Sequence, residues 1–545
     1  MNNNVKNAKS KIILPIAIAI SVILGVLIGK IIYKDKTFSS SFPFGSGGNK
    51  LDQIMKVIES NYVDDMSIDE LEEIAIAKFL ETLDPHTVYL NPLQAKAANE
   101  ELDGNFEGIG IQFNIFKDTI LVVNVIPKGP SEDAGLLAGD RIVKVNDSVV
   151  ASIGIASDSV MKLLKGKGGT IVNLDVKRKN INDLIRFKVK RGNIPLNSID
   201  ALYLIDKNIA YVKILNFGKN TYLDFWQKLS VLKIEGAKSV VIDLRGNGGG
   251  YLDAAVNMID EFFDGGKLIV YTEGKSTGKR VMKSTNSKKS FVDMNLVVLI
   301  DEFSASASEI FAGAIQDNDR GFIIGRRSFG KGLVQQVSDF DDGSVLRFTV
   351  SRYYTPAGRC IQKKYSSDRN EYDSDIINRF RHGEFSQQDS INFSDTTKYF
   401  TKNGRVVYAG GGIMPDIFVP SDTSNYSNLL VEINQKNLYY NYSLQFVDNN
   451  RDKLKNVKNV NALKSFLYSH NAYSLFWTYV KENNVKMKDS DLRISKNYIE
   501  NLFCAYVARQ VLSEDDFVKI INNDDVVLNQ AIKVLRENRK LPNPH

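Results

Sequence analysis

The chain has 545 residues, which is too many for one hydrophobic core and predicts several domains. Hydrophobic residues make up 43% and charged residues 25% of the sequence, with 12 prolines, so a disordered, collagen-like or coiled-coil protein is excluded. The net charge of +6 is small for so large a surface and gives no reason to expect nucleic acid as a partner.

An apolar run opens the chain. Residues 12–29 carry no charge, and a helix of that length spans a bilayer core. The run is longer than the apolar region of a typical signal peptide, and no small-residue cleavage pattern follows it. We therefore expect residues 1–33 to form an uncleaved signal anchor, a single transmembrane helix in the inner (cytoplasmic) membrane; a removed signal peptide is the alternative. The rest of the chain would lie on the periplasmic or extracytoplasmic side, tethered by a flexible linker over residues 34–49.

A small helical segment is predicted over residues 50–104. Apolar residues recur there at helical spacing, at Leu51, Ile54, Met55 and Ile58. Ser67 and Glu70 match a capping box, which predicts the start of a second helix.

The residue pattern changes from helical to β-rich over residues 105–192. Short β-rich runs are broken there by Gly and Pro, and one helix is expected near residues 157–165. This pattern predicts a compact β domain.

Residues 193–424 are predicted to form an α/β core. Buried strands such as SVVIDL and LVVLI alternate with amphipathic helical segments up to about residue 360. Residues 361–400 are polar and rich in Ser and Asp, and we expect a long insertion or loop. Residues 425–545 have a helical pattern without a chemical motif, which predicts a C-terminal helical extension.

The segment DEFSASASEIFAGAIQD, residues 301–317, follows the strand LVVLI directly. Apolar spacing starts a helix near Ala307 and leaves Ser306 at its N-terminus, where free N–H groups and the helix dipole suit an oxyanion. Ser306 and Glu309 also match a capping box. The serine is therefore a candidate nucleophile or a helix cap.

Two further segments carry candidate chemistry. Lys331, in SFGKGLVQQ, lies between two glycines; it is either a solvated surface residue or a base whose pKa burial lowers from about 10.4 to about 7–8. The turn DLRGNGGG, residues 243–250, presents unobstructed N–H groups but has neither nucleotide-binding glycine pattern.

Together these three segments resemble the carboxyl-terminal processing proteases, also called tail-specific proteases, which are serine endopeptidases with a Ser/Lys dyad. The resemblance extends to LDPHTVYL, residues 83–90, and to GGGIMPDIFVP, residues 410–420. It implies that Ser306 is the nucleophile, Lys331 the general base and Gln335 the residue that orients the lysine. It also implies an oxyanion hole formed by the backbone N–H groups of Ala307 and of a glycine in the 248–250 turn, with Gly250 favoured.

The β domain resembles the PDZ domain of the same family, on the segments FEGIGIQF and VIPKGPSEDAGLLAGDRIVKVND. The resemblance implies that the N–H groups around Ile109, Gly110 and Ile111 hold a C-terminal carboxylate. The bound peptide would add a strand to the edge of the sheet.

The resemblance implies an α+β and α/β multidomain protein, with a crotonase-like or ClpP-like protease core and an inserted PDZ domain. The expected function is that of a membrane-anchored endopeptidase acting on proteins and peptides with exposed C-termini. The mechanism needs no cofactor or metal, and the two cysteines and four histidines are too scattered to suggest a structural zinc site. Two alternatives remain: a catalytically silent, tethered PDZ scaffold that binds C-terminal peptides, and a Ser/Lys enzyme that acts on a non-peptide acyl substrate, such as an amide in the cell wall.

Overall fold

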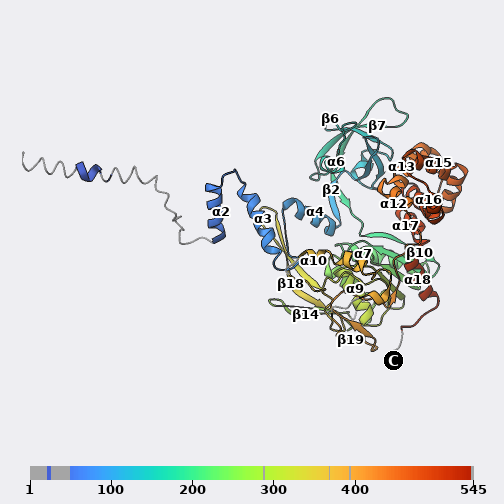
Figure 1. Cartoon of the computed structure of the whole chain (residues 1–545). Helices are drawn as coiled ribbons and strands as arrows, with labels where there is room; N and C mark the ends of the chain where they lie inside the picture. The colour runs from blue at the N-terminus through green and yellow to red at the C-terminus, as the bar shows by residue number, and fades with distance from the viewer. Residues whose placement is uncertain are drawn as a thin grey trace, which may run out of the picture. The chain divides into compact units, whose positions relative to one another are not determined.

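The computed structural model describes residues 21–25, 27, 50–285, 289–366, 369–391 and 395–541 (Figure 1). The chain separates into two compact units, Met1–Ile76 and Ala77–His545. The predicted anchor and linker lie almost wholly outside the described residues. Among the helices that are described, none has the length and apolar character needed to cross a membrane.

The helices predicted near the N-terminus are present. They are α2 (Lys50–Asn61) and α3 (Ile68–Leu80), and the Glu70 N–H donates to the Ser67 hydroxyl at 3.3 Å. A further helix, α4 (Pro92–Asp103), begins with a capping box between Asn91 and Gln94. The expected helical segment therefore contains three helices, and a short strand also lies within it.

A six-stranded sheet forms the centre of the α/β core. Its order is β10-β11-β12-β15-β16-β21, and all neighbours are parallel except the antiparallel pair β10 and β11. The strands are β10 (Ile199–Asp206), β11 (Ile209–Ile214), β12 (Ser239–Asp243), β15 (Asn295–Ile300), β16 (Phe322–Gly325) and β21 (Ile417–Phe418). The carboxyl ends of β12 and β15 meet at one edge, which brings the two segments that follow them together.

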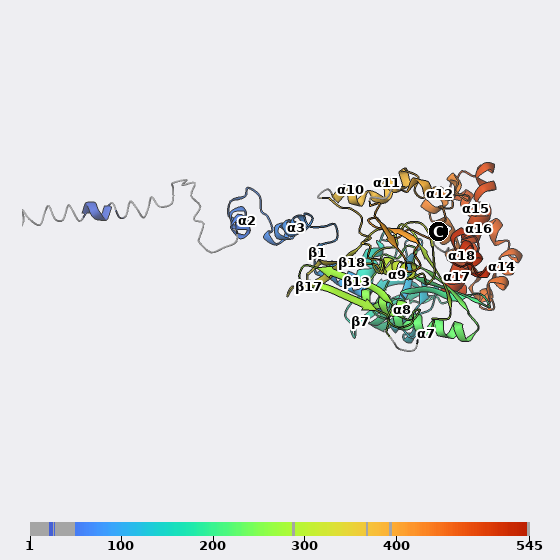
Figure 2. The ribbon, with the colours of Figure 1, turned by 90° about the horizontal axis from the view of Figure 1, so that it is seen from below.

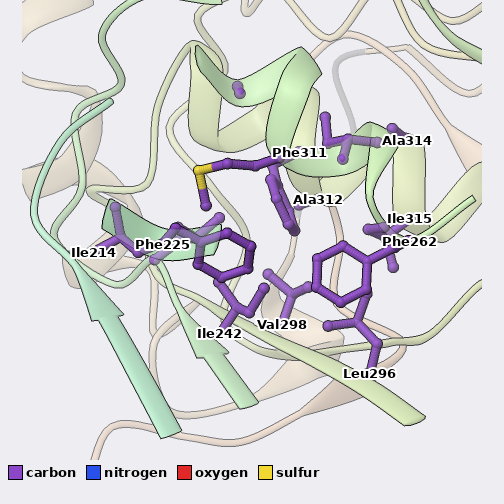
Figure 3. Packing of buried hydrophobic residues seen from close by; sticks show 14 of the residues in the cluster. Ile214, Phe225, Ile242, Phe262, Leu296, Val298, Phe311, Ala312, Ala314 and Ile315 are labelled. Carbon is purple, nitrogen blue, oxygen red and sulfur yellow. The ribbon is translucent and has the colours of Figure 1, made fainter. Parts of the chain in front are cut away.

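Helices cover both faces of this sheet. One face packs against α7 (Thr221–Ile234), α8 (Leu252–Asp260) and α9 (Ala307–Asp317). Figure 3 shows this core, where the rings of Phe225, Phe262 and Phe311 lie among aliphatic side chains of the strands. The other face packs against residues of the C-terminal helices α17 (Glu514–Asn522) and α18 (Val526–Arg536).

A second, antiparallel sheet carries part of the site. Its strands are β1 (Val88–Leu90), β13 (Leu268–Gly274), β14 (Gly278–Lys283), β17 (Leu333–Asp339) and β18 (Val345–Tyr354). The short strand β1 pairs with β18, with Val88 opposite Arg347. This pairing brings the LDPHTVYL segment beside the hairpin that contains Gln335.

The β domain is built on a six-stranded sheet with its own apolar core. Its strands are β3 (Ile111–Ile115), β4 (Ile120–Val125), β5 (Arg141–Val145), β6 (Ser148–Val149), β7 (Ile171–Lys177) and β8 (Ile185–Lys190). The predicted helix is α6 (Ser157–Leu164), and a short helix α5 (Pro130–Asp133) accompanies it. Where the chain enters and leaves the domain, β2 (Asn105–Gly108) pairs with β9 (Gly192–Pro195).

The expectation of a loop over residues 361–400 is wrong in part. The described residues there include α10 (Arg369–Asp373) and α11 (Asp375–Arg381), and β19 (Lys398–Phe400) pairs with β20 (Val406–Tyr408). Burial of Tyr372 and Arg379 fixes the two helices, although the polar composition of the segment hides these contacts.

The C-terminal extension is helical, as predicted. Figure 2 shows it in orange and red. Its helices before α17 are α12 (Asn428–Gln435), α13 (Leu438–Leu454), α14 (Val460–Ser469), α15 (Ala472–Glu482) and α16 (Asp489–Val511). These helices share an apolar core of their own, which includes buried Phe476 and Phe503.

Candidate active site

Ser306 lies in a strained turn at the start of α9. It is the N-cap residue of the helix, with φ of 56° and ψ of −114°. A positive φ is uncommon for a residue with a side chain, and such strain costs about 1–3 kcal/mol. The surrounding structure must therefore hold this backbone in place.

Glu309 supplies that support. Its side chain is fully buried and accepts a hydrogen bond from the Ser306 N–H at 2.9 Å, which confirms the predicted capping box. The carboxylate also accepts from the Ser328 hydroxyl at 2.5 Å, the Gly330 N–H at 2.7 Å and the Lys331 N–H at 2.8 Å. One carboxylate thus joins the serine turn to the lysine loop.

Tyr353, on β18, forms a second link between these two segments. Its hydroxyl lies 3.1 Å from the Ser306 carbonyl oxygen and 2.5 Å from that of Lys331, and its ring is buried. The backbones of Ser306 and Lys331 are therefore linked twice: through their N–H groups by Glu309, and through their carbonyl groups by Tyr353.

The Lys331 amine is oriented by Gln335. Its Nζ donates to the Gln335 Oε1 at 3.0 Å, and the Gln335 Nε2 donates in turn to the His86 carbonyl oxygen. In the described residues the amine makes no direct hydrogen bond to the Ser306 hydroxyl. Such contacts are often loose in enzymes without substrate and tighten when the substrate is bound.

The charge of Lys331 is disfavoured by its surroundings. Burial lowers its pKa to about 8, and the positive charge of Arg347 acts in the same direction. Asp84 and Glu309 oppose this shift. Burial also raises the pKa of Glu309 to about 7. With a pKa of about 8, roughly a tenth of the lysine is neutral at pH 7 and available as a base.

The glycine turn lies against the serine turn. A Cβ atom on Gly249 would lie 2.8 Å from the Cβ of Ser306, so only glycine fits there. The Gly249 N–H already donates to the Asn247 Oδ1 at 2.8 Å. Within the residues described, the Gly250 and Ala307 N–H groups donate to no protein acceptor. These are the two groups predicted to form an oxyanion hole.

His86 also lies at this site, although the sequence places it far from the serine. Its Nε2 is 2.7 Å from the Tyr372 hydroxyl. Burial lowers the pKa of His86 to about 3, and the charge of Lys331 contributes, so the ring is neutral. The pairing of β1 with β18 brings His86 close to Lys331. In the sequence, only its position in the segment LDPHTVYL pointed to the site.

The predicted carboxylate-binding segment of the β domain leads into an edge strand. Ile109 is buried in the domain core, and Gly110 has a φ of +75°. Ile111 is the first residue of β3, which forms one edge of the sheet. An edge strand presents free backbone groups to which a peptide can add.

In the ranges that the structure covers, no group of three or more His, Cys, Asp or Glu residues is placed to hold a metal ion. Cys360 and Cys504 are free cysteines, and burial raises the pKa of both thiols.

Three parts of the chain match known protein families. Residues 208–372 match peptidase family S41, residues 108–193 match the PDZ domain, and residues 429–513 match a family of unknown function. Carboxy-terminal processing protease CtpA of Bacillus subtilis (strain 168) is 35% identical over 323 residues, which cover 58% of this chain and 68% of that protein. A probable CtpA-like serine protease of Staphylococcus aureus (strain N315) is 36% identical over 58% of this chain and 63% of its own length.

Among solved structures, the photosystem II D1 C-terminal processing protease is 30% identical, with a TM-score of 0.31 over 56% of this chain and 88% of that chain. On the relationship to the Bacillus subtilis protein, the chain belongs to the carboxy-terminal processing serine proteases of peptidase family S41 and carries a PDZ domain.

Proposed function

We propose that the protein cleaves peptide bonds through an acyl-enzyme on Ser306, with Lys331 as the general base. The observation that carries this proposal is the buried Lys331 amine, with a pKa of about 8, on a loop that Glu309 joins to the serine turn. A neutral amine can take the proton of a serine hydroxyl, the role that histidine has in other serine hydrolases.

The steps follow from the positions of these groups. Lys331 Nζ accepts the proton as Ser306 Oγ attacks the carbonyl carbon, and the Gly250 and Ala307 N–H groups stabilise the oxyanion that forms. The lysine then donates the proton to the leaving amine, and the C–N bond breaks. Water, deprotonated by the same lysine, attacks the ester carbonyl carbon, and the lysine returns the proton to Ser306 Oγ as the C–O bond to the serine breaks.

The PDZ domain would select the substrate. We propose that a protein C-terminus pairs with the edge strand β3 and that its carboxylate meets the N–H groups around Ile109, Gly110 and Ile111. The free edge of β3 and the left-handed backbone at Gly110 support this role.

Membrane anchoring is part of the same proposal. The uncharged run of residues 12–29 supports an N-terminal anchor with the protease on the extracytoplasmic side. Cell fractionation and protease accessibility of the full chain test this placement. Recovery in the soluble fraction, or a catalytic domain protected inside the cytoplasm, would contradict it.

A terminal-residue swap on one tagged substrate tests the function. Wild type, Ser306→Ala and Lys331→Ala are compared on matched substrates that differ only in their last residues, and the products are identified by mass spectrometry. We expect cleavage of a peptide bond by the wild type, sensitivity to the tail, and no cleavage by either variant. Binding without turnover by the wild type would favour the silent scaffold, and cleavage of a non-peptide amide alone would favour the other alternative.

A further inference from the structure

The C-terminal extension reaches the turn that carries Gly250. Asp525, the N-cap residue of α18, accepts hydrogen bonds from the Val527 and Leu528 N–H groups, both at 2.9 Å. The same carboxylate pairs with Arg245 of the glycine turn, with Nη1 to Oδ1 at 3.1 Å and Nη2 to Oδ2 at 2.7 Å. A residue of the extension therefore contacts the turn directly.

Arg245 is shared between two carboxylates. Its Nε and Nη2 also donate to Asp243 at the end of β12, at 3.0 and 2.6 Å. The side chains of Arg245, Asp525 and Asp243 are 18%, 16% and 1% exposed, so water screens these pairs only weakly. Lys213, 3.3 Å from Asp243, adds a second cation. Arg245 and Lys213 thus face the two carboxylates of Asp243 and Asp525.

Packing, and not the ion pair alone, fixes the position of Asp525. The apolar side of α18 is buried against the central sheet, where its four buried residues meet strand residues of β12 and β15: Val527, Leu528, Ala531 and Val534 against Val241, Val297 and Leu299. The carboxylate thus has a defined place from which to hold the arginine.

A second chain of contacts leads from the extension to Asp243. Asn522 of α17 donates to the Tyr203 hydroxyl at 2.9 Å, and the ring of Tyr203 lies against that of Tyr211 with centroids 5.1 Å apart. The Tyr211 hydroxyl donates to Asp243 at 2.7 Å. The extension therefore contacts the turn directly through Asp525 and reaches Asp243 indirectly through Asn522 and the two tyrosines.

The turn itself has little freedom to move. The Arg245 carbonyl accepts from Lys213 at 2.5 Å, and the Gly246 N–H donates to Asp301 at 2.9 Å. Beyond these residues, Gly249 lies in close contact with Ser306. A displacement of Arg245 would therefore move the backbone that presents the Gly250 N–H.

We propose that Asp525 is a positioning residue of the active site, which holds Arg245 and through it the turn that presents the Gly250 N–H to the oxyanion. The inference rests on the proposed function, since it assumes that this N–H stabilises the transition state. It gives the C-terminal extension a role in catalysis.

Asp525→Asn tests the proposal, because asparagine still caps a helix but lacks the charge that pairs with Arg245. For a peptide substrate we expect kcat to fall about tenfold, KM to stay within about twofold, and the affinity for a peptide boronic acid to fall as kcat does. Asp525→Glu keeps the charge and should recover part of the loss. Thermal unfolding of each variant verifies that the chain folds.

Asp524→Asn is the matched control. Asp524 precedes Asp525 and accepts from Asn501 at 2.8 Å, but it has no contact with Arg245. An unchanged kcat in Asp525→Asn, an equal loss in Asp524→Asn, or an unchanged boronic acid affinity would overturn the inference. Failure of the proposed function has a different signature, because the wild type would then show no turnover, or Ser306→Ala would still cleave the substrate.

Discussion

The proposed catalytic cluster and the PDZ edge are built in opposite ways. The catalytic cluster consists of Ser306, Glu309, Lys331, Gln335 and Tyr353, whose polar groups are joined by hydrogen bonds in a largely buried setting. The PDZ edge consists of Ile109, Gly110 and the partly exposed strand β3. Buried, mutually dependent groups fix a reaction geometry, whereas an open strand edge accepts many peptides. Changes in the cluster should therefore alter kcat, and changes at the edge should alter KM.

The largest effect is expected for Ser306→Ala. Without the hydroxyl no acyl-enzyme forms, so kcat should fall at least about a thousandfold. Binding of a C-terminal peptide, measured by calorimetry, should match the wild type, because the PDZ edge does not depend on the cluster. A variant that loses peptide binding to the same degree would break the separation of the two regions.

The second-largest effect is expected for Glu309→Gln. The carboxylate accepts from Ser306, Ser328, Gly330 and Lys331, and an amide replaces one acceptor oxygen with a donor that faces some of these donors. We expect a loss of about 2–4 kcal/mol in the free energy of unfolding and at least a tenfold loss in kcat. Urea unfolding and steady-state kinetics measure both. Wild-type values for both would show that this carboxylate does not organise the cluster.

The pH dependence of kcat should also distinguish the cluster from the PDZ domain. In the proposed mechanism neutral Lys331 is the active form, and burial lowers its pKa to about 8, so kcat should rise with pH through about 8 and level off above about 9. The gain between pH 7 and 9 should be about tenfold, from the change in the neutral fraction. Peptide binding to the PDZ domain should show no such step. A kcat that is constant from pH 6 to 9 would contradict a lysine base.

The smallest effect is expected for Gly110→Ala. Gly110 has a φ of +75°, and a Cβ there would lie 3.0 Å from Ile194 and 3.4 Å from Pro130. The strained loop should raise KM for a tailed substrate by up to about tenfold and leave kcat unchanged. Gly154→Ala is the control, since Gly154 has a φ of +66° but open space around it. Equal effects of the two substitutions on KM would show that the loop around Gly110 has no special role in binding the substrate tail.

The sequence was informative where neighbours along the chain define the feature. The start of α9, the glycine turn after β12 and the C-terminal helices follow from local periodicity and caps, and all are present. The contacts of Glu309 with the lysine loop and the place of His86 depend on long-range pairing, which local patterns do not encode. For the same reason the helices α10 and α11 were missed: burial of Tyr372, and not periodicity, defines that region.

Covalent labelling of Ser306 tests the central claim most directly. The rate at which a fluorophosphonate adds to the intact chain is followed by mass spectrometry in wild type, Ser306→Ala and Lys331→Ala, with folded protein verified by circular dichroism. The account predicts one adduct per wild-type chain, none in Ser306→Ala, and labelling of Lys331→Ala slowed about a hundredfold or more. An adduct in Ser306→Ala, or an unchanged labelling rate in Lys331→Ala, would contradict it.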